Sequence, residues 1–255
     1  MTKPLPEKFD QVHVDGDILI YGICSSCEYC ARFDDDLDMV FCNINEALFL
    51  AGNTLDKYKK MSRNGYLTLY FTGQGNFRKE LYPAYKAHRK KVRKPAGYAA
   101  LKKLLDENYH CVTEDRLEAD DLIGINHTRC LELGIESLMA SIDKDFKTIP
   151  GWLYNPDTDG FTYQTVEEAD RYWLMQTLIG DKTDGYPGLE GVGPVSAEKL
   201  LTKHGATWQT VEEAFVNSGF TAEYALVQAR MARILRNNEY DFVNKEVRLW
   251  QPVKN

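Results

Sequence analysis

The chain has 255 residues, of which 44% are hydrophobic and 27% charged, and its formal net charge is −7. This balance is typical of a globular protein with one large or two small domains, and it excludes wholesale disorder. The amino-terminal stretch MTKPLPEKFDQV is polar, and no apolar run approaches the roughly 20 residues that span a bilayer. We therefore expect a cytoplasmic protein without a membrane partner.

Strand and helix patterns alternate along the first two-thirds of the chain. QVHVD predicts a strand ending at Asp15, and further strands are predicted over 65–73, 109–113 and 136–146. Helices are predicted over 38–62, 96–109 and 118–134, and a hairpin with an Asp-Gly turn over 151–166. This order predicts an α/β fold, a doubly wound and mostly parallel sheet. Beyond about residue 165 the pattern becomes helical.

Three cysteines form a C-x-x-C-x-x-C run: Cys24, Cys27 and Cys30. Such a run can hold a metal or an iron–sulfur cluster. However, no histidine is nearby, the segment 22–30 reads largely as an amphipathic helix, and the other cysteines are scattered. We expect reduced structural thiols here.

The charge is unevenly distributed. The segment from Lys57 to Lys103 holds 14 Lys/Arg and one acid, Glu80, whereas the remainder holds 17 Lys/Arg and 37 Asp/Glu. A solvated charged helix is the alternative, but such helices usually mix both signs. A positive segment on an acidic body indicates a polyanionic partner.

Acidic residues gather in four clusters. They are Asp15 with Asp17, the trio Glu118, Asp120 and Asp121, Asp143 with Asp145, and Asp181 with Asp184. Residues two apart share a face of a strand, as we expect for Asp143 and Asp145, and residues three apart meet in a helical turn. Ligand sets made only of oxygen select Mg²⁺ or Mn²⁺, and two such ions suit attack on a phosphodiester.

A glycine-rich hairpin is predicted between two helices in GDKTDGYPGLEGVGPVSAEKLL. Glycines let backbone N–H groups approach an anion, and the amino end of a helix favours negative charge. This arrangement suits a phosphate backbone and reads no bases.

Five motifs together resemble the 5′-nuclease superfamily, in the order in which that family has them: VDGD, NFRKELYPAYKAHR, LEADDLIG, SIDKDF and GDKTDGYPGLEGVGPVSAEKLL. The family comprises flap endonucleases, the 5′-nuclease domain of bacterial DNA polymerase I and phage 5′→3′ exonucleases, and the chain looks most like the last. The resemblance implies a PIN-like nuclease core over residues 1–165, with a basic helical arch at about 78–105. It also implies a helical DNA-binding region over 166–255, with a helix–hairpin–helix at about 176–205.

The resemblance also implies roles for individual residues. The implied ligands of two Mg²⁺ or Mn²⁺ ions are Asp15, Glu118, Asp120, Asp121, Asp143, Asp145, Asp181 and Asp184. Lys86 and Arg89 match the catalytic basic residues of the arch. The expected DNA contacts are Arg78, Tyr85, Lys90, Lys91, Arg93, Lys94, Gly191, Val192, Gly193 and Lys199. The family's hairpin also holds a monovalent cation such as K⁺, here at Val192.

One position departs from the family. Many relatives carry an aspartate at the end of the strand before the FR element, where this chain has Thr72 and Gly73. Asp17 is not a usual family position, and it either helps the metal ligands or caps the next helix.

The function implied by the resemblance is 5′→3′ exonuclease and 5′-flap endonuclease activity. The expected substrate is duplex DNA with a 5′ end, nick or flap, or the RNA strand of an RNA–DNA hybrid, bound by a monomer. Two alternatives stay open: a catalytically weak junction-binding protein, and a PIN-type ribonuclease.

Overall fold

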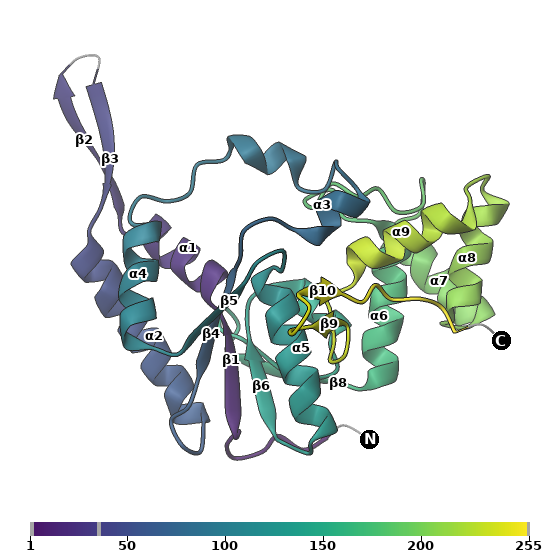
Figure 1. Ribbon diagram of the computed structural model, residues 1–255, viewed down its shortest axis with the longest axis horizontal. Coiled ribbons are helices and arrows are strands. Elements are labelled where there is room, and N and C mark those ends of the chain that lie inside the picture. The colour runs from purple at the N-terminus through teal and green to yellow at the C-terminus, as the bar shows by residue number, and fades with distance from the viewer. Residues whose placement is uncertain (1–2, 35–36, 254–255) are drawn as a thin grey trace.

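A six-stranded sheet forms the centre of the protein, seen in a computed structural model that describes residues 3–34 and 37–253 (Figure 1). Its strands lie in the order β5-β4-β1-β6-β7-β8, and all pairs except β7–β8 are parallel. The strands are β1 (Gln11–Asp15), β4 (Thr68–Thr72), β5 (Cys111–Glu114), β6 (Ser137–Ala140), β7 (Gly151–Asn155) and β8 (Gly160–Gln164). The prediction of a mostly parallel sheet is confirmed.

Helices cover both faces of this sheet. Buried residues of α1 (Gly16–Ser26), α2 (Ile44–Met61) and α4 (Tyr98–Asn108) share one apolar cluster with the strands, whereas α5 (Ala119–Glu132) contributes to a second cluster. The chain passes from the first face to the second between β5 and β6, and it places β6 beside β1. In such sheets ligands bind outside the carboxyl ends of the strands, next to the point where the order reverses.

A two-stranded hairpin lies between α1 and α2, where the sequence predicted a helix from residue 38. It consists of β2 (Glu28–Asp34) and β3 (Leu37–Cys42), and it projects from the body on the side of α4 (Figure 1). The helix α2 begins only at Ile44. The hairpin also divides the cysteine run, because Cys24 belongs to α1 and Cys30 to β2, and all six cysteines are free thiols.

The basic segment crosses above the carboxyl ends of the strands (Figure 1). It contains α3 (Phe77–Leu81) and the short 3₁₀ helix η1 (Ala87–Lys91), joined to α4 by extended chain. Pro83 and Pro95 interrupt the pattern, and proline ends or kinks helices. The arch is therefore short helical pieces rather than one continuous helix.

The last third of the chain is mainly helical. It contains α6 (Val166–Ile179), α7 (Pro194–His204), α8 (Trp208–Asn217) and α9 (Ala222–Ala232), which share a third apolar cluster. The chain then returns to the core, where Ile234, Leu235 and Tyr240 pack with α5, and it ends with β9 (Tyr240–Asp241) and β10 (Glu246–Val247). The division at about residue 165 stays a prediction. None of the described helices combines the length and the apolar character that crossing a membrane requires.

Candidate active site

Glu118 lies at the centre of a charge network beneath the arch. Its carboxylate accepts hydrogen bonds from Lys86 Nζ at 2.6 Å and from the Tyr85 hydroxyl at 2.7 Å. Burial opposes its ionisation, but Lys86 and Arg78 outweigh burial and lower the pKa of Glu118 to about 2. This carboxylate is therefore ionised and joins the arch to the amino end of α5.

Arg78 and Asp121 form a buried ion pair next to this network. The Arg78 guanidinium donates to both Asp121 oxygens at 2.7 Å, to Glu118 at 3.3 Å and to the Arg233 carbonyl at 2.6 Å. The backbone N–H of Leu235 donates to Asp121 as well. Arg78 is 2% exposed, so the expected contact between this side chain and DNA is wrong.

The same pair changes the expected role of Asp121. Carboxylate oxygens of Glu118, Asp120 and Asp121 come within 4.8 Å of one another, which is the spacing of a metal-binding group. However, Asp121 is completely buried, and both of its oxygens are already bound by Arg78. In this structure Asp121 is fully buried and holds Arg78, whereas Glu118 is 9% exposed and Asp120 is half-buried, so these two remain the candidates of the trio for facing a cation.

Tyr85 also differs from its expected role in contacting DNA. The ring is buried, and the hydroxyl donates to Glu118 at 2.7 Å and to Asp184 at 3.2 Å. Its ring cannot stack on a base in this position. It instead fixes two acidic side chains that come from distant parts of the sequence.

Asp120 is the acidic residue of this region without a basic partner. Among the described residues it forms no ion pair, and its carboxylate accepts a hydrogen bond from the backbone N–H of Asp121 at 2.7 Å. Burial, with Asp121 and Glu118 nearby, raises its pKa well above the usual range. A carboxylate in this state favours an added positive charge.

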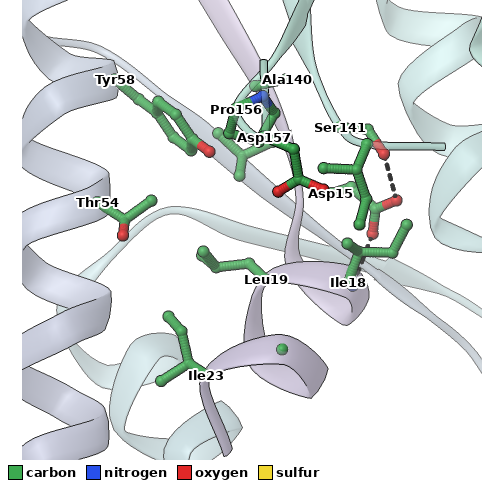
Figure 2. Close-up of a pocket in the computed structure, with 13 residues that line it drawn as sticks. Asp15, Ile18, Leu19, Ile23, Thr54, Tyr58, Ala140, Ser141, Pro156 and Asp157 are labelled. Carbon is green, nitrogen blue, oxygen red and sulfur yellow. Dashed lines mark hydrogen bonds between the residues drawn. The ribbon is translucent and has the colours of Figure 1, made fainter. Parts of the chain in front are cut away.

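Asp15 lies at the carboxyl end of β1 and caps α1. Its carboxylate accepts from the Ile18 backbone N–H at 3.1 Å and from the Ser141 hydroxyl at 3.2 Å (Figure 2). Burial, with smaller contributions from Asp17 and Asp143, raises the pKa of Asp15 to about 7. It follows that Asp15, and not Asp17, caps this helix.

Asp143 and Asp145 lie just beyond β6, in the first turn of the 3₁₀ helix η2 (Lys144–Thr148). Asp143 caps this helix by accepting from the Asp145 backbone N–H at 2.8 Å. Asp145 accepts from the Gln176 amide at 2.6 Å, and burial together with Asp143 raises its pKa to about 7. The expectation that the two share a face of a strand is wrong, because the strand ends at Ala140.

Asp181 and Asp184 lie in a tight turn after α6. Asp181 accepts from the backbone N–H groups of Thr183 and Asp184, and from Lys144 Nζ at 3.0 Å. Asp184 accepts from Arg89 at 2.8 Å and lies 3.6 Å from Lys86 Nζ. The turn thus brings one carboxylate toward the arch and the other toward η2.

The donor set fits divalent cations. Burial and neighbouring acids raise the pKa values of Asp15, Asp120 and Asp145, and burial raises that of Asp184, so the protein destabilises the ionised forms of these groups. These carboxylates come from several segments and lack enough positive charge around them. A bound hard cation, which prefers oxygen ligands, would stabilise their ionised forms.

At the end of β4, where many relatives carry an aspartate, Thr72 and Gly73 make other contacts. The Thr72 hydroxyl accepts from the Ala119 backbone N–H at 3.1 Å. A side chain at Gly73 would lie 2.0 Å from the Glu114 carbonyl oxygen, so no carboxylate can stand there. Asp17 reaches this strand end instead, accepting from the Thr72 backbone N–H at 2.9 Å and from the Tyr98 hydroxyl.

The remaining cations of the arch border a cavity of about 530 Å³ beside the strand ends. Arg89, Arg93 and Lys94 line it together with His88 and Tyr98. Arg93 also forms a bidentate ion pair with Glu28 of β2, at 2.7 and 3.0 Å. The side chains of Lys90 and Lys91 lie outside the described part of the structure.

The glycine-rich hairpin connects α6 to α7 at the surface. Gly191 is exposed with φ +79°, Val192 and Gly193 are half-buried, and Lys199 is exposed on α7. Gly193 precedes Pro194 at the start of α7 and has no side-chain cap there. The hairpin borders a cavity of about 710 Å³ with Phe220 and Tyr224.

Three contributors to the site were not identified from the sequence: Ser141, Gln176 and Lys144. Ser141 and Lys144 belong to the acidic SIDKD motif itself, which was a usable signal. Gln176 is one polar position on a buried helix face, and no local pattern marks it.

Comparisons with known proteins agree on the family. The model of the 5′-3′ exonuclease, N-terminal resolvase-like domain, matches residues 35–166. The chain is 34% identical to the exonuclease of Escherichia phage T7, over 94% of this chain and 92% of that protein. It is 30% identical to the flap endonuclease Xni of Shewanella piezotolerans, over 57% of this chain and 62% of that protein.

Solved structures show the same fold. The 5′-exonuclease of T5 with bound zinc ions superposes with a TM-score of 0.64 at 15% identity, covering 87% of this chain and 88% of that one. The catalytic core of Rad2 in complex with DNA gives 0.53 at 16% identity, covering 86% and 70%. The chain therefore belongs to the 5′-3′ exonuclease family.

Proposed function

We propose that this protein is a metal-dependent phosphodiesterase, acting on DNA as a 5′→3′ exonuclease and 5′-flap endonuclease. The observation that carries the proposal is that Glu118, with Asp120 beside it, and Asp184 meet beneath a basic arch, where Tyr85 bonds Glu118 and Asp184, Lys86 pairs with both and Arg89 pairs with Asp184. The names of the phage exonucleases and of Xni support the activity, and the Rad2 complex with DNA supports the substrate.

Bound divalent cations would supply the Lewis acid that activates water and stabilises the leaving oxygen. Asp15, Glu118, Asp120, Asp143, Asp145, Asp181 and Asp184 would hold them. Lys86 and Arg89 pair with Glu118 and Asp184 in the free protein, and we infer that they turn to the scissile phosphate when it arrives. Their positive charge then stabilises the transition state.

Finer features belong to the same proposal. We infer two ions of Mg²⁺ or Mn²⁺, and K⁺ at Val192 of the hairpin, where backbone groups would hold the duplex. The division into a nuclease core (1–165) and a helical DNA-binding region (166–255) is part of this proposal. We also infer 5′→3′ polarity, activity on the RNA strand of a hybrid, a monomer, and a cytoplasmic location.

The test is product analysis on 5′-labelled blunt, nicked and flapped duplexes with Mg²⁺, for the wild type and for Asp120→Ala. We expect the wild type to release short 5′ products. Cleavage by Asp120→Ala should fall by about 10³-fold or more, because a cation ligand is lost, while DNA affinity is retained. Full cleavage by this variant would contradict the assignment.

The two rival functions give different results in the same assay. A junction-binding protein would bind the flapped duplex without any metal-dependent product. A PIN-type ribonuclease would cleave only where ribose replaces deoxyribose in the labelled strand. The glycine-rich hairpin between α6 and α7, which we propose holds backbone phosphates, favours a duplex substrate.

A further inference from the structure

A third cavity lies on the α2 side of Asp15. It has a volume of about 210 Å³, opens to the surface at Gly22 and Asp157, and is bordered by the ends of β1 and β6, by Pro156 after β7, and by the helices α1 and α2 (Figure 2). None of the described residues that line it belongs to the arch or to the hairpin between α6 and α7. The cavity therefore lies away from the arch and that hairpin, although it shares Asp15 with the proposed cation ligands.

The lining of this cavity favours a cation with an apolar body. Asp15 and Asp157 contribute two carboxylates, whereas no lysine, arginine or histidine is found among its described lining residues. Most of the remaining wall is aliphatic, including Ile18, Leu19 and Ile23. Aliphatic walls suit an organic ligand better than a hydrated metal ion, which needs polar partners on all sides.

Tyr58 brings a hydroxyl without a protein partner to the wall of the cavity. The residue is 3% exposed and lines the cavity, and in Figure 2 its hydroxyl points toward the side of Asp157. No hydrogen bond of this hydroxyl is found within residues 3–34 and 37–253. A hydroxyl that opens onto a cavity and has no protein partner marks a place for a ligand atom or an ordered water.

We propose that this cavity binds a small organic cation, namely an amidinium or primary ammonium group on a short apolar body. The charged head lies between Asp157, Asp15 and the Tyr58 hydroxyl, and the body packs on Leu19 and Ile23. At about 210 Å³ the space is below the roughly 300–1,000 Å³ of drug-sized ligands, so the occupant is small. The proposal does not depend on the proposed nuclease function.

Titration of the full chain with benzamidine, without DNA or metal, tests the site by protein-detected NMR. We expect saturable shifts confined to the residues that line the cavity. Neutral benzamide has nearly the same shape, and we expect it to bind at least about tenfold more weakly, because the charge is lost. Equal binding of the two compounds would overturn the assignment of a cation site.

Glycines on two helices provide a matched pair of variants. Gly22 lines the cavity and Gly52 does not, and an added Cβ meets nothing within 4 Å at either position. Gly22→Leu should abolish benzamidine binding by filling the space, whereas Gly52→Leu should leave it unchanged. Tyr58→Phe, which removes an unpartnered hydroxyl, should weaken it several-fold. Undiminished binding by Gly22→Leu would place the ligand elsewhere.

A ligand bound in this cavity should also affect cation binding at Asp15, which we propose as a ligand of the divalent cations. A cation beside this carboxylate repels another, so saturating benzamidine should weaken Mn²⁺ binding by the wild type but not by Gly22→Leu. Direct Mn²⁺ titration followed by EPR measures this without DNA. An unchanged Mn²⁺ affinity would overturn the placement of the ligand head beside Asp15. If benzamidine binds but no DNA is cleaved, the proposed function fails and this site stands.

Discussion

Arg78 shows that a basic residue in a basic segment can be structural. Arg78→Ala should destabilise the protein by about 3–5 kcal/mol, because Asp121 is left buried without its partner. Urea denaturation monitored by circular dichroism measures the loss. Arg93→Ala is the control, because its ion pair with Glu28 is exposed to solvent on the arginine side and its loss should change stability much less.

The alternative role of Arg78 predicts a different result. A DNA contact would lower affinity and leave the free energy of unfolding unchanged. That outcome would contradict the buried ion pair as the main role of Arg78.

Lys86 should act on turnover more than on binding. Its Nζ lies 2.6 Å from Glu118, so it is held beside the proposed cation ligands rather than on the proposed docking surface for the duplex. We expect Lys86→Ala to lower kcat by about 10²-fold with a much smaller change in DNA affinity. Single-turnover kinetics with saturating enzyme separate the two. Lys94→Ala, from the exposed arch, should show the reverse pattern, and a purely affinity-based loss in Lys86→Ala would make it a docking residue.

At the scale of elements, the sequence predicted the main sheet well and the connections poorly. β1 and β4 carry dense apolar patterns bounded by turn residues, and their positions are confirmed. The hairpin β2–β3 was missed because LDMVFC runs directly into the helical pattern of α2. Its apolar side chains, such as Phe33 and Met39, are exposed, so burial did not select a strand pattern there.

The acidic positions were easier to predict than their partners. Carboxyl ends of parallel strands meet at one edge, so Asp15 and Asp143 could be placed near each other from strand predictions alone. The partners of Asp145 and Glu118 depend on how α6 and the arch pack on the sheet. No local pattern contains that information, which is why Gln176 was missed and Tyr85 was assigned to DNA.

The hairpin between α6 and α7 should bind DNA through its backbone. Gly191 has φ +79° and open space around it, so Gly191→Ala strains the local backbone by about 1 kcal/mol without a clash. We expect weaker duplex binding in a fluorescence anisotropy titration, and a near-normal rate at saturating DNA.

Gly219 is the matched control for this experiment. It has φ +89°, is equally open, and lies in the turn after α8. Gly219→Ala should cost similar stability and leave DNA affinity unchanged. Equal losses of affinity in both variants would indicate a general effect of backbone strain rather than a role of the hairpin.

At the scale of the whole molecule, acidic strand ends lie beneath a basic arch, and each stabilises the other in the free protein. Lys86, Arg89 and Lys144 partly neutralise carboxylates that are otherwise costly to bury. The net charge of −7 conceals this polarity. Because the arch cations are shared between acids and phosphate, we expect DNA affinity to depend on salt and on bound cations together.

Acid should destabilise the whole fold through a histidine far from the arch. His13 of β1 is 1% exposed, its Nδ1 lies 2.9 Å from the Tyr70 hydroxyl, and its ring lies 5.8 Å from that of His127. Burial lowers the pKa of His13 to about 4, whereas the unfolded chain has the ordinary value of 6.5. The unfolded state therefore binds more protons below pH 6.5, and stability is lost as the pH falls from 6.5 toward 4.

This shift in the pKa of His13 corresponds to a loss of about 3 kcal/mol in the free energy of unfolding once the pH is below both pKa values. The free energy of unfolding, measured by urea denaturation between pH 7.5 and 4.5, should fall less in His13→Gln than in the wild type. Asp15 and Asp145, whose pKa values are raised, act in the opposite direction, but they are common to both proteins and cancel in the difference. His204→Gln, on the exposed end of α7, should follow the wild type. The difference in the free energy of unfolding between the wild type and His13→Gln could also stay constant from pH 7.5 to 4.5. That result would show that proton uptake by His13 does not limit acid stability.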